Sequence, residues 1–360
     1  MEKDIIVVSN LHKLDDSRIY HNEICSLISS GFNVTYITSD IIDDRIDAHK
    51  ALKVKTFKVS GGRVLGSLQF QFRLLREYKG FKGVFMFHDP ELLLCALVLK
   101  IFFRKTIIFD SHEDLPRQIL TKPYNKGLNR YLLKAVIHII VTIYGIIDYH
   151  ICATPEIKRV MERYKKPIFV AYNYPDFKNI ERTTTVDNRH VLTYIGGVSK
   201  IRGYDMLNIL SKDFNLLVAG PLVDINQSDL ASSKVKYLGV LRRTLVVNLL
   251  SSTGIGLCLL HPTPAYSKSI PIKIMEYLSM GIPVICTDIP YWRELFEWTG
   301  ACVFVEYGNI GKMYEQVHWL QKENNWEKAH NNALNCRGSF SWLSIEKEFI
   351  SFVSNAYSNS

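Results

Sequence analysis

The chain has 360 residues and a formal net charge of +9, with 47% hydrophobic and 22% charged residues. This composition is typical of globular proteins and excludes a disordered or fibrous chain, and the length suggests two domains with a large buried core. Seven scattered cysteines, none in a CxxC pair, are typical of reduced cytosolic thiols and give no zinc-binding pattern, and the charged first residues predict no signal peptide.

The positive charge lies almost entirely in the first half of the chain. Residues 1–172 hold 26 Lys and Arg against 18 Asp and Glu, whereas residues 173–360 hold 18 against 17. Nine basic residues fall between Lys50 and Lys82, opposed by Glu77 alone. A solvated basic face would explain them, but so uneven a distribution favours an anionic partner: a membrane surface, a phosphorylated acceptor or nucleic acid.

The first half alternates short β-rich runs with stretches of helical length. One such stretch is amphipathic from Arg18 to Ser30 and ends at Gly31. Continuous apolar strands separated by helices predict a parallel sheet that is covered on both faces. The apolar runs cover residues 4–9, 33–38, 83–88, 106–110 and 149–154.

The second half repeats this scheme, so we predict an α/β protein of two doubly wound, Rossmann-like domains that face each other across a cleft. The polar, Thr-rich interval 173–189 is typical of a linker between domain 1–172 and domain 190–337. Residues 338–360, with a helix near Trp342 to Tyr357, are expected to pack back on the first domain. The apolar runs of this half cover residues 190–197, 214–220, 235–239, 255–260, 283–287 and 302–306.

The most apolar stretch runs from Leu132 to Ile147 and contains Lys134 and His138. It is shorter than the roughly twenty apolar residues that a membrane-spanning helix needs. We therefore expect a buried helix of the first domain.

The most informative segment is SKSIPIKIMEYLSMGIPVICTDIPYWRELF, residues 267–296. Ser269 and Pro271 are expected to open a helix that carries Lys273 and Glu276 on one face. A helix start with free N–H groups is suited to phosphate, and a carboxylate can accept two hydrogen bonds from a ribose diol. An ordinary surface ion pair is the alternative.

A glycine loop, YIGGVSKIRG, spans residues 194–203 at the end of the first strand of the second domain. Gly196 and Gly197 allow a backbone to approach a ligand closely. Lys200 or Arg202 could then clamp a diphosphate.

Two strand ends of the first half carry histidine beside acids, in HDPELL (88–93) and FDSHED (109–114). A histidine in this position can be a general acid or base, a metal ligand, or a hydrogen-bonded loop residue. The residue types alone leave these alternatives open.

Together these segments resemble retaining glycosyltransferases of the GT-B fold, particularly glycosyltransferase family 4 of the bacterial surface-polysaccharide type. PIKIMEYLSMGIPVI is similar to the family's donor-binding segment, where Glu276 matches the Glu that binds the nucleotide ribose. The family's other Glu falls at Lys268, which changes the usual contact to the transferred sugar. The resemblance extends over nearly the whole chain.

The resemblance implies a donor site in the second domain, with Arg202 at the pyrophosphate and Gly220 near the base. The donor-binding residues it implies are Gly196, Gly197, Lys200, Arg202, Gly220, Lys268, Ser269, Ile270, Lys273 and Glu276.

The resemblance also implies a catalytic group of His112, Asp110 and Glu113 near the donor sugar. His112 is expected to position groups and stabilise charge, not to act as a covalent nucleophile. The second domain has no D-x-D spacing, so we expect neither a metal nor any other cofactor. On the acceptor side the resemblance implies Asp16, Arg18, His88 and Asp89.

We therefore expect a retaining, metal-independent hexosyltransferase that moves a sugar from a nucleotide-diphosphate sugar to a saccharide acceptor. The expected acceptor is linked to a lipid carrier, in capsule, O-antigen or exopolysaccharide synthesis. A non-hydrolysing nucleotide-sugar epimerase of the same fold is one alternative, and a non-catalytic basic binder at a membrane surface is another. No nucleic-acid-binding signature is present.

A basic and aromatic segment, SLQFQFRLLREYKG, predicts where the protein contacts a membrane. Its rings would point into the interface, and Arg73, Arg76 and Lys79 would lie at anionic headgroups. This predicts a cytoplasmic protein that is peripheral on the inner face of the plasma membrane. The alternative is that Phe70, Phe72 and Leu75 are core residues.

Overall fold

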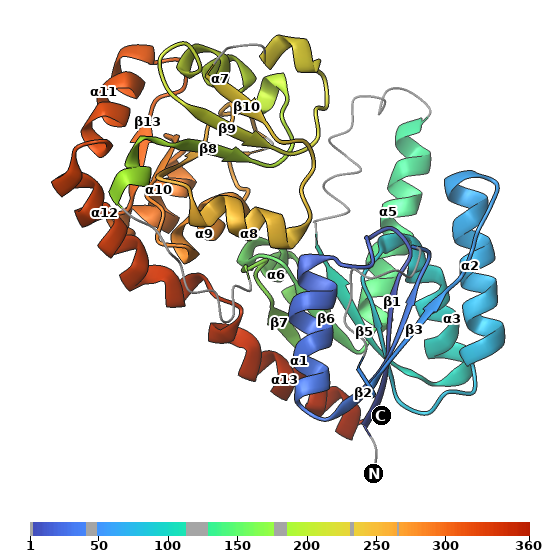
Figure 1. The fold of residues 1–360 in the computed structure, drawn as a ribbon. Helices are drawn as coiled ribbons and strands as arrows, with labels where there is room; N and C mark the ends of the chain where they lie inside the picture. The colour runs from blue at the N-terminus through green and yellow to red at the C-terminus, as the bar shows by residue number, and fades with distance from the viewer. Residues whose placement is uncertain (1–2, 41–48, 113–128, 176–185, 231–233, 265) are drawn as a thin grey trace. The chain divides into compact units, whose positions relative to one another are not determined.

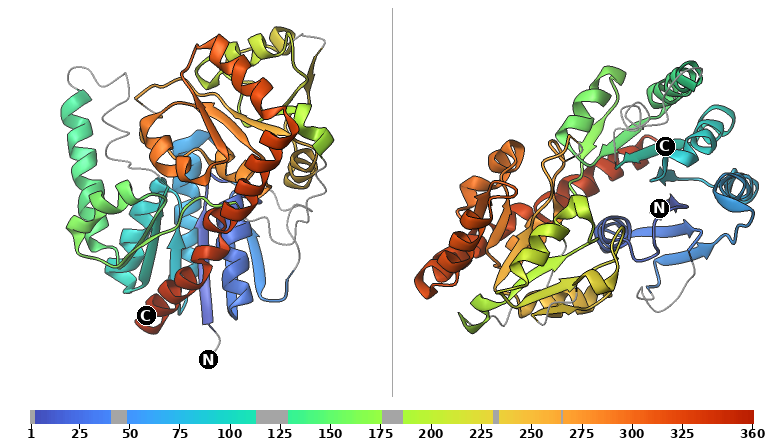
Figure 2. Two further views of the ribbon diagram at one scale, coloured as in Figure 1. Left: turned by 90° about the vertical axis from the view of Figure 1, so that its left-hand side faces the viewer. Right: turned by 90° about the horizontal axis from the view of Figure 1, so that it is seen from above.

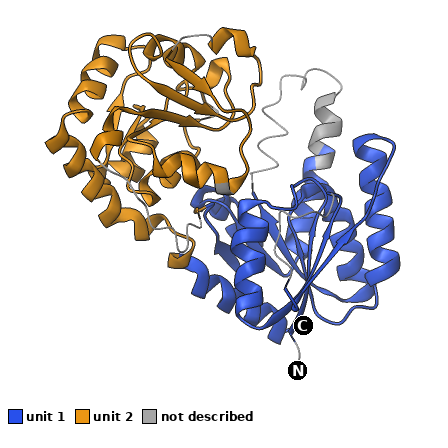
Figure 3. Ribbon diagram, in the orientation of Figure 1, with its two compact units in different colours: residues 1–173, 345–360 blue, residues 174–344 orange. Residues whose placement is uncertain are grey.

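The computed structural model describes residues 3–40, 49–112, 129–175, 186–230, 234–264 and 266–360. The chain divides into two compact units, shown in Figure 3. The first unit contains residues 1–173 and 345–360, and the second contains residues 174–344.

The first unit is built on one parallel sheet with the strand order β3-β2-β1-β4-β5-β6-β7. Every neighbouring pair is parallel, so all seven carboxyl ends lie at the same edge. The central strands β1, β4 and β5 are buried on both faces, as their apolar runs predict. The strands are β1 (Lys3–Ser9), β2 (Phe32–Thr38), β3 (Leu52–Thr56), β4 (Val84–Phe87), β5 (Thr106–Ser111), β6 (Tyr149–Cys152) and β7 (Ile168–Val170).

Helices cover both faces of this sheet (Figures 1 and 2). One face packs against α2 (Gly62–Tyr78), α3 (Leu93–Phe103), α5 (Asn129–Ile146) and α6 (Pro155–Met161) in a single hydrophobic cluster. The helical segment η1 (Ser17–Ile24), a wide π-type helix, runs directly into α1 (Cys25–Ser29). Helix α13 (Leu343–Ser358) contacts α1 through the Ser26 hydroxyl, which donates to Glu346 at 2.6 Å, and packs Phe349 against Phe169.

The second unit repeats the arrangement with the strand order β10-β9-β8-β11-β12-β13, again wholly parallel. Its strands are β8 (Leu192–Ile195), β9 (Leu216–Ala219), β10 (Val235–Tyr237), β11 (Ile255–Cys258), β12 (Val284–Thr287) and β13 (Cys302–Val305). Its α-helices are α7 (Tyr204–Leu210), α8 (Arg243–Ser251), α9 (Ile272–Ser279), α10 (Pro290–Phe296), α11 (Ile310–Leu320) and α12 (Glu323–Cys336).

The predicted fold class, two doubly wound Rossmann-like units, is confirmed, and each apolar run of the sequence contains a strand. The runs leave out two strands at the edges of the first sheet: β3, where Lys53 and Lys55 interrupt the apolar residues, and β7, which has only three residues. Among the described residues no helix is long and apolar enough to cross a bilayer. The apolar stretch near residue 140 forms α5, which buries Ile143 and Tyr144 but exposes Ile139.

Candidate functional site

Two cationic side chains of the second unit lie over the glycine pair at the carboxyl end of β8. A methyl group added at Gly196 would lie 3.5 Å from Nζ of Lys273, and one added at Gly197 would lie 2.5 Å from Nη1 of Arg202. Gly196 has a φ of +109°, a conformation that favours glycine. The loop therefore brings a bare backbone and two positive charges together.

Tyr194 holds this loop in place. Its hydroxyl donates to the carbonyl of Gly197 at 2.9 Å, and Nζ of Lys273 lies 3.8 Å from the centre of its ring. Among the described residues, neither Lys273 nor Arg202 has a carboxylate within ion-pair distance. Two cations without a carboxylate partner make this loop electrostatically suited to a diphosphate.

Glu276 follows Lys273 by one turn of α9 and is half-buried. Burial raises the pKa of its carboxyl above the usual range, and the positive charges of Arg243 and Lys273 oppose that rise. The alternative of an ordinary ion pair between Lys273 and Glu276 does not form in the structure, which leaves the carboxylate oxygens for a ligand. Arg243 opens α8, and sequence reasoning missed it because Arg242–Arg243 belongs to no motif.

Of the two residues predicted to open the donor-site helix, Pro271 lies at its start and Ser269 does not. Helix α9 begins at Ile272, and its preceding residue is Pro271, which makes no side-chain cap. Ser269 does not cap it, because its hydroxyl donates to the carbonyl of Tyr266 at 3.1 Å and its own carbonyl accepts from the Trp292 indole at 2.8 Å. The turn 266–269 is thus fixed by Trp292, a residue outside the motif.

The remaining predicted donor residues differ in their surroundings. Lys268 is exposed, with Nζ 5.5 Å from the ring centre of Tyr291, and Ile270 packs on the hydrophobic cluster of the unit. Lys200 is exposed. Gly220, at a φ of +141°, lets the end of β9 approach β8, since a methyl group there would lie 2.1 Å from the carbonyl oxygen of Gly196.

In the first unit, the adjacent strands β4 and β5 bring two histidines to one aspartate. Nδ1 of His88 lies 3.2 Å and Nε2 of His112 lies 3.1 Å from the same Oδ2 of Asp110. His88 and Asp110 are buried, while His112 is partly exposed. Asp110 can therefore hold the orientation of an imidazole that a ligand can reach.

A buried arginine, Arg18, pairs with the Asp110 carboxylate that the two histidines contact. Arg18, with 3% of its side chain exposed, donates from Nη2 to Oδ1 of Asp110 at 2.5 Å and from Nε to Oε1 of Glu23 at 3.0 Å. Its Nη1 also donates to Oδ1 of Asn173 at 2.9 Å. Each of the three guanidinium nitrogens thus donates a hydrogen bond within the unit.

The charges of this cluster follow from burial and from Arg18. Burial opposes ionisation of Asp110, but Arg18 and His112 outweigh it and hold the pKa of Asp110 well below its usual range. Burial and the nearby Asp110 carboxylate raise the pKa of Glu23, although Arg18 opposes them. Burial also lowers the pKa of His88. The Arg18 guanidinium thus favours the charged form of Asp110, while burial disfavours the charged form of Glu23.

Two residues predicted on the acceptor side hold loops together. Oδ1 of Asp16 accepts the backbone N–H groups of Arg18 and Ile19, which caps η1. Asp89 is buried, and its Oδ2 accepts the Ser9 hydroxyl at 2.8 Å and the N–H of Asn10 at 2.6 Å. Its Oδ1 lies 2.9 Å from Nδ1 of His12. Glu113, the third predicted catalytic residue, lies outside the described residues.

Among the described residues, one group has a geometry that could hold a metal ion: the possible ligand atoms of His88, Asp110 and His112 lie within 4.8 Å of one another. Each of these atoms already has a hydrogen-bond partner within the group. Nε2 of His88, on the other side of the ring, has no hydrogen-bond partner and lies 3.5 Å from Oε2 of Glu23. Sequence reasoning did not find Glu23, His12 or Asn173, because their roles come from contacts between distant segments.

Comparison with known proteins agrees with this geometry. Residues 189–323, most of the second unit, match the family of glycosyl transferases group 1. No curated protein sequence is significantly similar to the chain.

Solved structures share the fold over the full length of the chain. Sucrose-phosphate synthase from Thermosynechococcus elongatus superposes with a TM-score of 0.73 at 13% identity, covering 100% of both chains. HepE from Anabaena, in complex with UDP-glucose, gives 0.68 at 14% identity over 98% of this chain and 99% of that one. WaaG, a glycosyltransferase involved in lipopolysaccharide biosynthesis, gives 0.65 at 13% identity over 97% and 99%. The chain thus has the GT-B architecture, and residues 189–323 of its second unit are similar to group 1 glycosyl transferases.

The buried pair of Arg18 and Asp110 predicts a large loss of stability when one partner is removed. Arg18→Leu leaves the Asp110 carboxylate buried without its cation and should lower the free energy of unfolding by about 3–5 kcal/mol. Denaturant unfolding measures this change. Arg73→Leu is the matched control, since Arg73 makes an exposed pair with Glu77 at 3.0 Å whose loss should cost about 0–1 kcal/mol. Equal losses in the two variants would show that the buried pair is not the stabilising contact.

Proposed function

We propose that this protein is a retaining glycosyltransferase that moves a sugar from a nucleotide-diphosphate sugar to a saccharide acceptor. The observation that carries the proposal is the pair of cations, Lys273 and Arg202, over the Gly196–Gly197 backbone without carboxylate partners among the described residues. The family match over residues 189–323 and the UDP-glucose bound in the similar HepE structure support it.

In the proposed reaction, the bond between the anomeric carbon and the diphosphate oxygen breaks, and negative charge develops on the leaving diphosphate. Lys273 and Arg202 stabilise that charge electrostatically, so the reaction needs no metal ion. The acceptor hydroxyl bonds to the anomeric carbon on the same face, and its proton passes to the departing diphosphate oxygen. Asp110 orients the His112 imidazole, and His112 helps to position the transferred sugar and stabilises the charge that develops near it.

We further propose that the acceptor is attached to a lipid carrier and that the first unit binds an anionic membrane surface. Helix α3 packs beside α2, and both expose large apolar side chains, including Val64 at 76%, Phe72 at 69% and Phe102 at 75%. The exposed Arg76, Lys79 and Arg104 lie on the same two helices or at their ends. Apolar groups beside basic groups fit the interface of a bilayer that contains anionic lipid.

The structure corrects the membrane-facing segment in two respects. Phe70 and Leu74 face the core, so only part of the aromatic run is available to a membrane. Arg73 pairs with Glu77, which leaves Arg76 and Lys79 as its more exposed basic residues. The exposed residues of α3 extend the proposed surface beyond the predicted segment. With an acceptor in the membrane, the enzyme would act at the cytoplasmic face in surface-polysaccharide synthesis.

Glu276→Ala should weaken binding of the nucleotide sugar by about 2–3 kcal/mol, because a ribose diol loses a charged hydrogen-bond partner. A thermal-shift screen in EDTA first selects the nucleotide sugar that stabilises the wild type most, and calorimetry then gives its affinity. Wild-type binding should weaken as the pH falls through the raised pKa of Glu276, and Glu276→Gln should lose that dependence. Glu315→Ala on α11 is the control. Donor affinity unchanged in Glu276→Ala would refute this donor site.

Vesicle sedimentation tests the membrane surface. Binding should require anionic lipid and weaken with salt, because screening shortens the range of the attraction. The double variant Arg76→Glu/Lys79→Glu should bind at least roughly tenfold more weakly, since each basic residue near the surface contributes about 1 kcal/mol. Lys322→Glu/Lys328→Glu in the second unit is the control with the same change of charge. Equal binding to neutral and anionic vesicles, or none to either, would favour a soluble acceptor.

A further inference from the structure

Two ring nitrogens and one carboxylate oxygen of the first unit converge at the carboxyl ends of β4 and β5. They are Nδ1 of His88, Nε2 of His112 and Oδ2 of Asp110. The nitrogens lie 3.2 Å and 3.1 Å from the oxygen and 3.5 Å from each other. A tetrahedral zinc ion with bonds of about 2.0–2.1 Å separates its ligand atoms by roughly 3.3 Å. The three distances therefore match the spacing of ligands around zinc.

The ligand types also favour zinc. Two imidazoles and one carboxylate form a zinc site with three protein ligands, in which a fourth position stays open. Magnesium prefers an all-oxygen shell, and its octahedral geometry spaces neighbouring ligand atoms by only about 2.9 Å. Iron(II) accepts two histidines and one carboxylate, but its octahedral geometry also brings them closer together.

The residues around this group hold it in the orientation that an ion needs. Nη2 of Arg18 donates to Oδ1 of Asp110 at 2.5 Å, which leaves Oδ2 on the side of the histidines. Nε2 of His88 and Oε2 of Glu23 are buried, lie 3.5 Å apart and have no hydrogen-bond partner in the described part of the chain. An ion on Nδ1 of His88 would place the ring proton on Nε2, where it faces Glu23. Histidines that bind metals usually donate their second N–H to a carboxylate in this way.

The group can be reached from the side of His112. The side chain of His112 is 19% exposed, whereas His88 and Asp110 are buried behind it. An ion that enters beside His112 replaces the protons shared between the three ligand atoms, and these protons pass to solvent. The fourth position of the ion then faces the exposed side.

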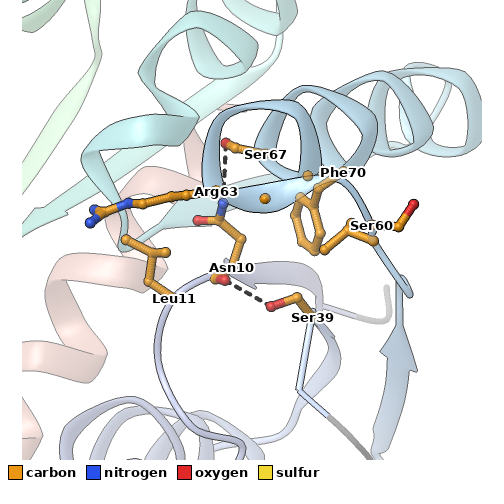
Figure 4. A pocket seen from close by; sticks show the side chains of 10 residues that line it. Asn10, Leu11, Ser39, Ser60, Arg63, Ser67 and Phe70 are labelled. Atoms are coloured by element: carbon orange, nitrogen blue, oxygen red, sulfur yellow. Dashed lines mark hydrogen bonds between the residues drawn. The ribbon is translucent and has the colours of Figure 1, made fainter.

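A pocket of the first unit, shown in Figure 4, offers no competing cation site. Its volume is about 270 Å³, and the ten residues that line it include no histidine, cysteine or carboxylate. Its charged side chain is Arg63, which pairs with Glu91 at 2.5 Å. A cation in this pocket would meet a positive charge and no ionised ligand.

We propose that His88, Asp110 and His112 bind one Zn²⁺ ion, with a water molecule in the fourth position beside His112. A bound ion occupies the ring nitrogen of His112 and so inhibits transfer of the sugar. Only this inhibition rests on the proposed function; the zinc site itself rests on the geometry of the three residues.

Calorimetric titration of ZnCl₂ into the tag-free full chain, with its thiols kept reduced, tests the site. One ion should bind per chain. His112→Gln should weaken binding at least about a hundredfold, because losing even an outer partner of a metal ligand commonly costs 10–100-fold. His138→Gln, at an exposed histidine of α5, is the matched control and should bind like the wild type. Thermal unfolding checks the fold of both variants, and His88→Gln gives a second test of the ligand set.

The spectrum of bound Co²⁺ identifies the ligands, because thiolates give a charge-transfer band that imidazole and carboxylate do not. A spectrum without this band is expected. No zinc binding, equal affinity in His112→Gln and the wild type, or a thiolate band that places the ion at cysteines would each overturn the proposal. Binding of nucleoside diphosphates is measured separately in EDTA. If zinc binds as expected and no nucleotide does, the zinc site stands and the proposed transferase function fails.

Discussion

Both sheets are wholly parallel, and this constraint places the loops that carry polar groups at one edge of each sheet. A parallel strand buried on both faces leaves its chemistry for the residues beyond its carboxyl end. In the first unit these residues are Asn10 after β1, Ser39 after β2, His88 after β4 and His112 after β5. In the second unit they are the glycines after β8 and β9. Residues far apart in sequence thus meet at one edge of each sheet.

The two units treat charge in opposite ways. In the first unit, the buried Arg18 cation is paired with Asp110 and Glu23, and burial raises the pKa of Glu23. In the second unit, Lys273 and Arg202 lie near the surface without a carboxylate partner among the described residues. A compensated cluster is suited to holding an imidazole in place, whereas uncompensated cations are suited to binding an anion.

The sequence allowed the fold and the main site segments to be predicted because strand burial and glycine loops are local signals. The apolar run 190–197 ends in Gly196 and Gly197, so both the strand and its loop could be read from consecutive residues. Strand β3 could not, since an edge strand with Lys53 and Lys55 lacks the burial signal. The place of Ser269 could not be predicted, because its carbonyl contacts the Trp292 indole 23 positions away and its hydroxyl does not cap α9.

The site residues that the sequence did not predict are brought together by contacts between distant segments. The pairing of Arg18 with Asn173 joins residues 155 positions apart, and that of Arg18 with Asp110 joins residues 92 positions apart. No spacing rule of helices or strands connects such pairs, so their roles appear only once the chain is folded. The exposed apolar side chains of α3 were missed for a related reason. An apolar helical pattern predicts burial, and only the folded structure shows which of its side chains are exposed.

The central claim is that Lys273 and Arg202 form the binding site for a nucleoside diphosphate. Calorimetric titration of UDP, GDP, UMP and GMP in EDTA, with the wild type and with Lys273→Met and Arg202→Met, tests it most directly. The account predicts that one diphosphate binds at least about tenfold more tightly than its monophosphate, since the second phosphate adds charge-assisted hydrogen bonds, and that either substitution removes this difference. Equal affinity for the diphosphate and the monophosphate, or a preference that survives both substitutions, would contradict it.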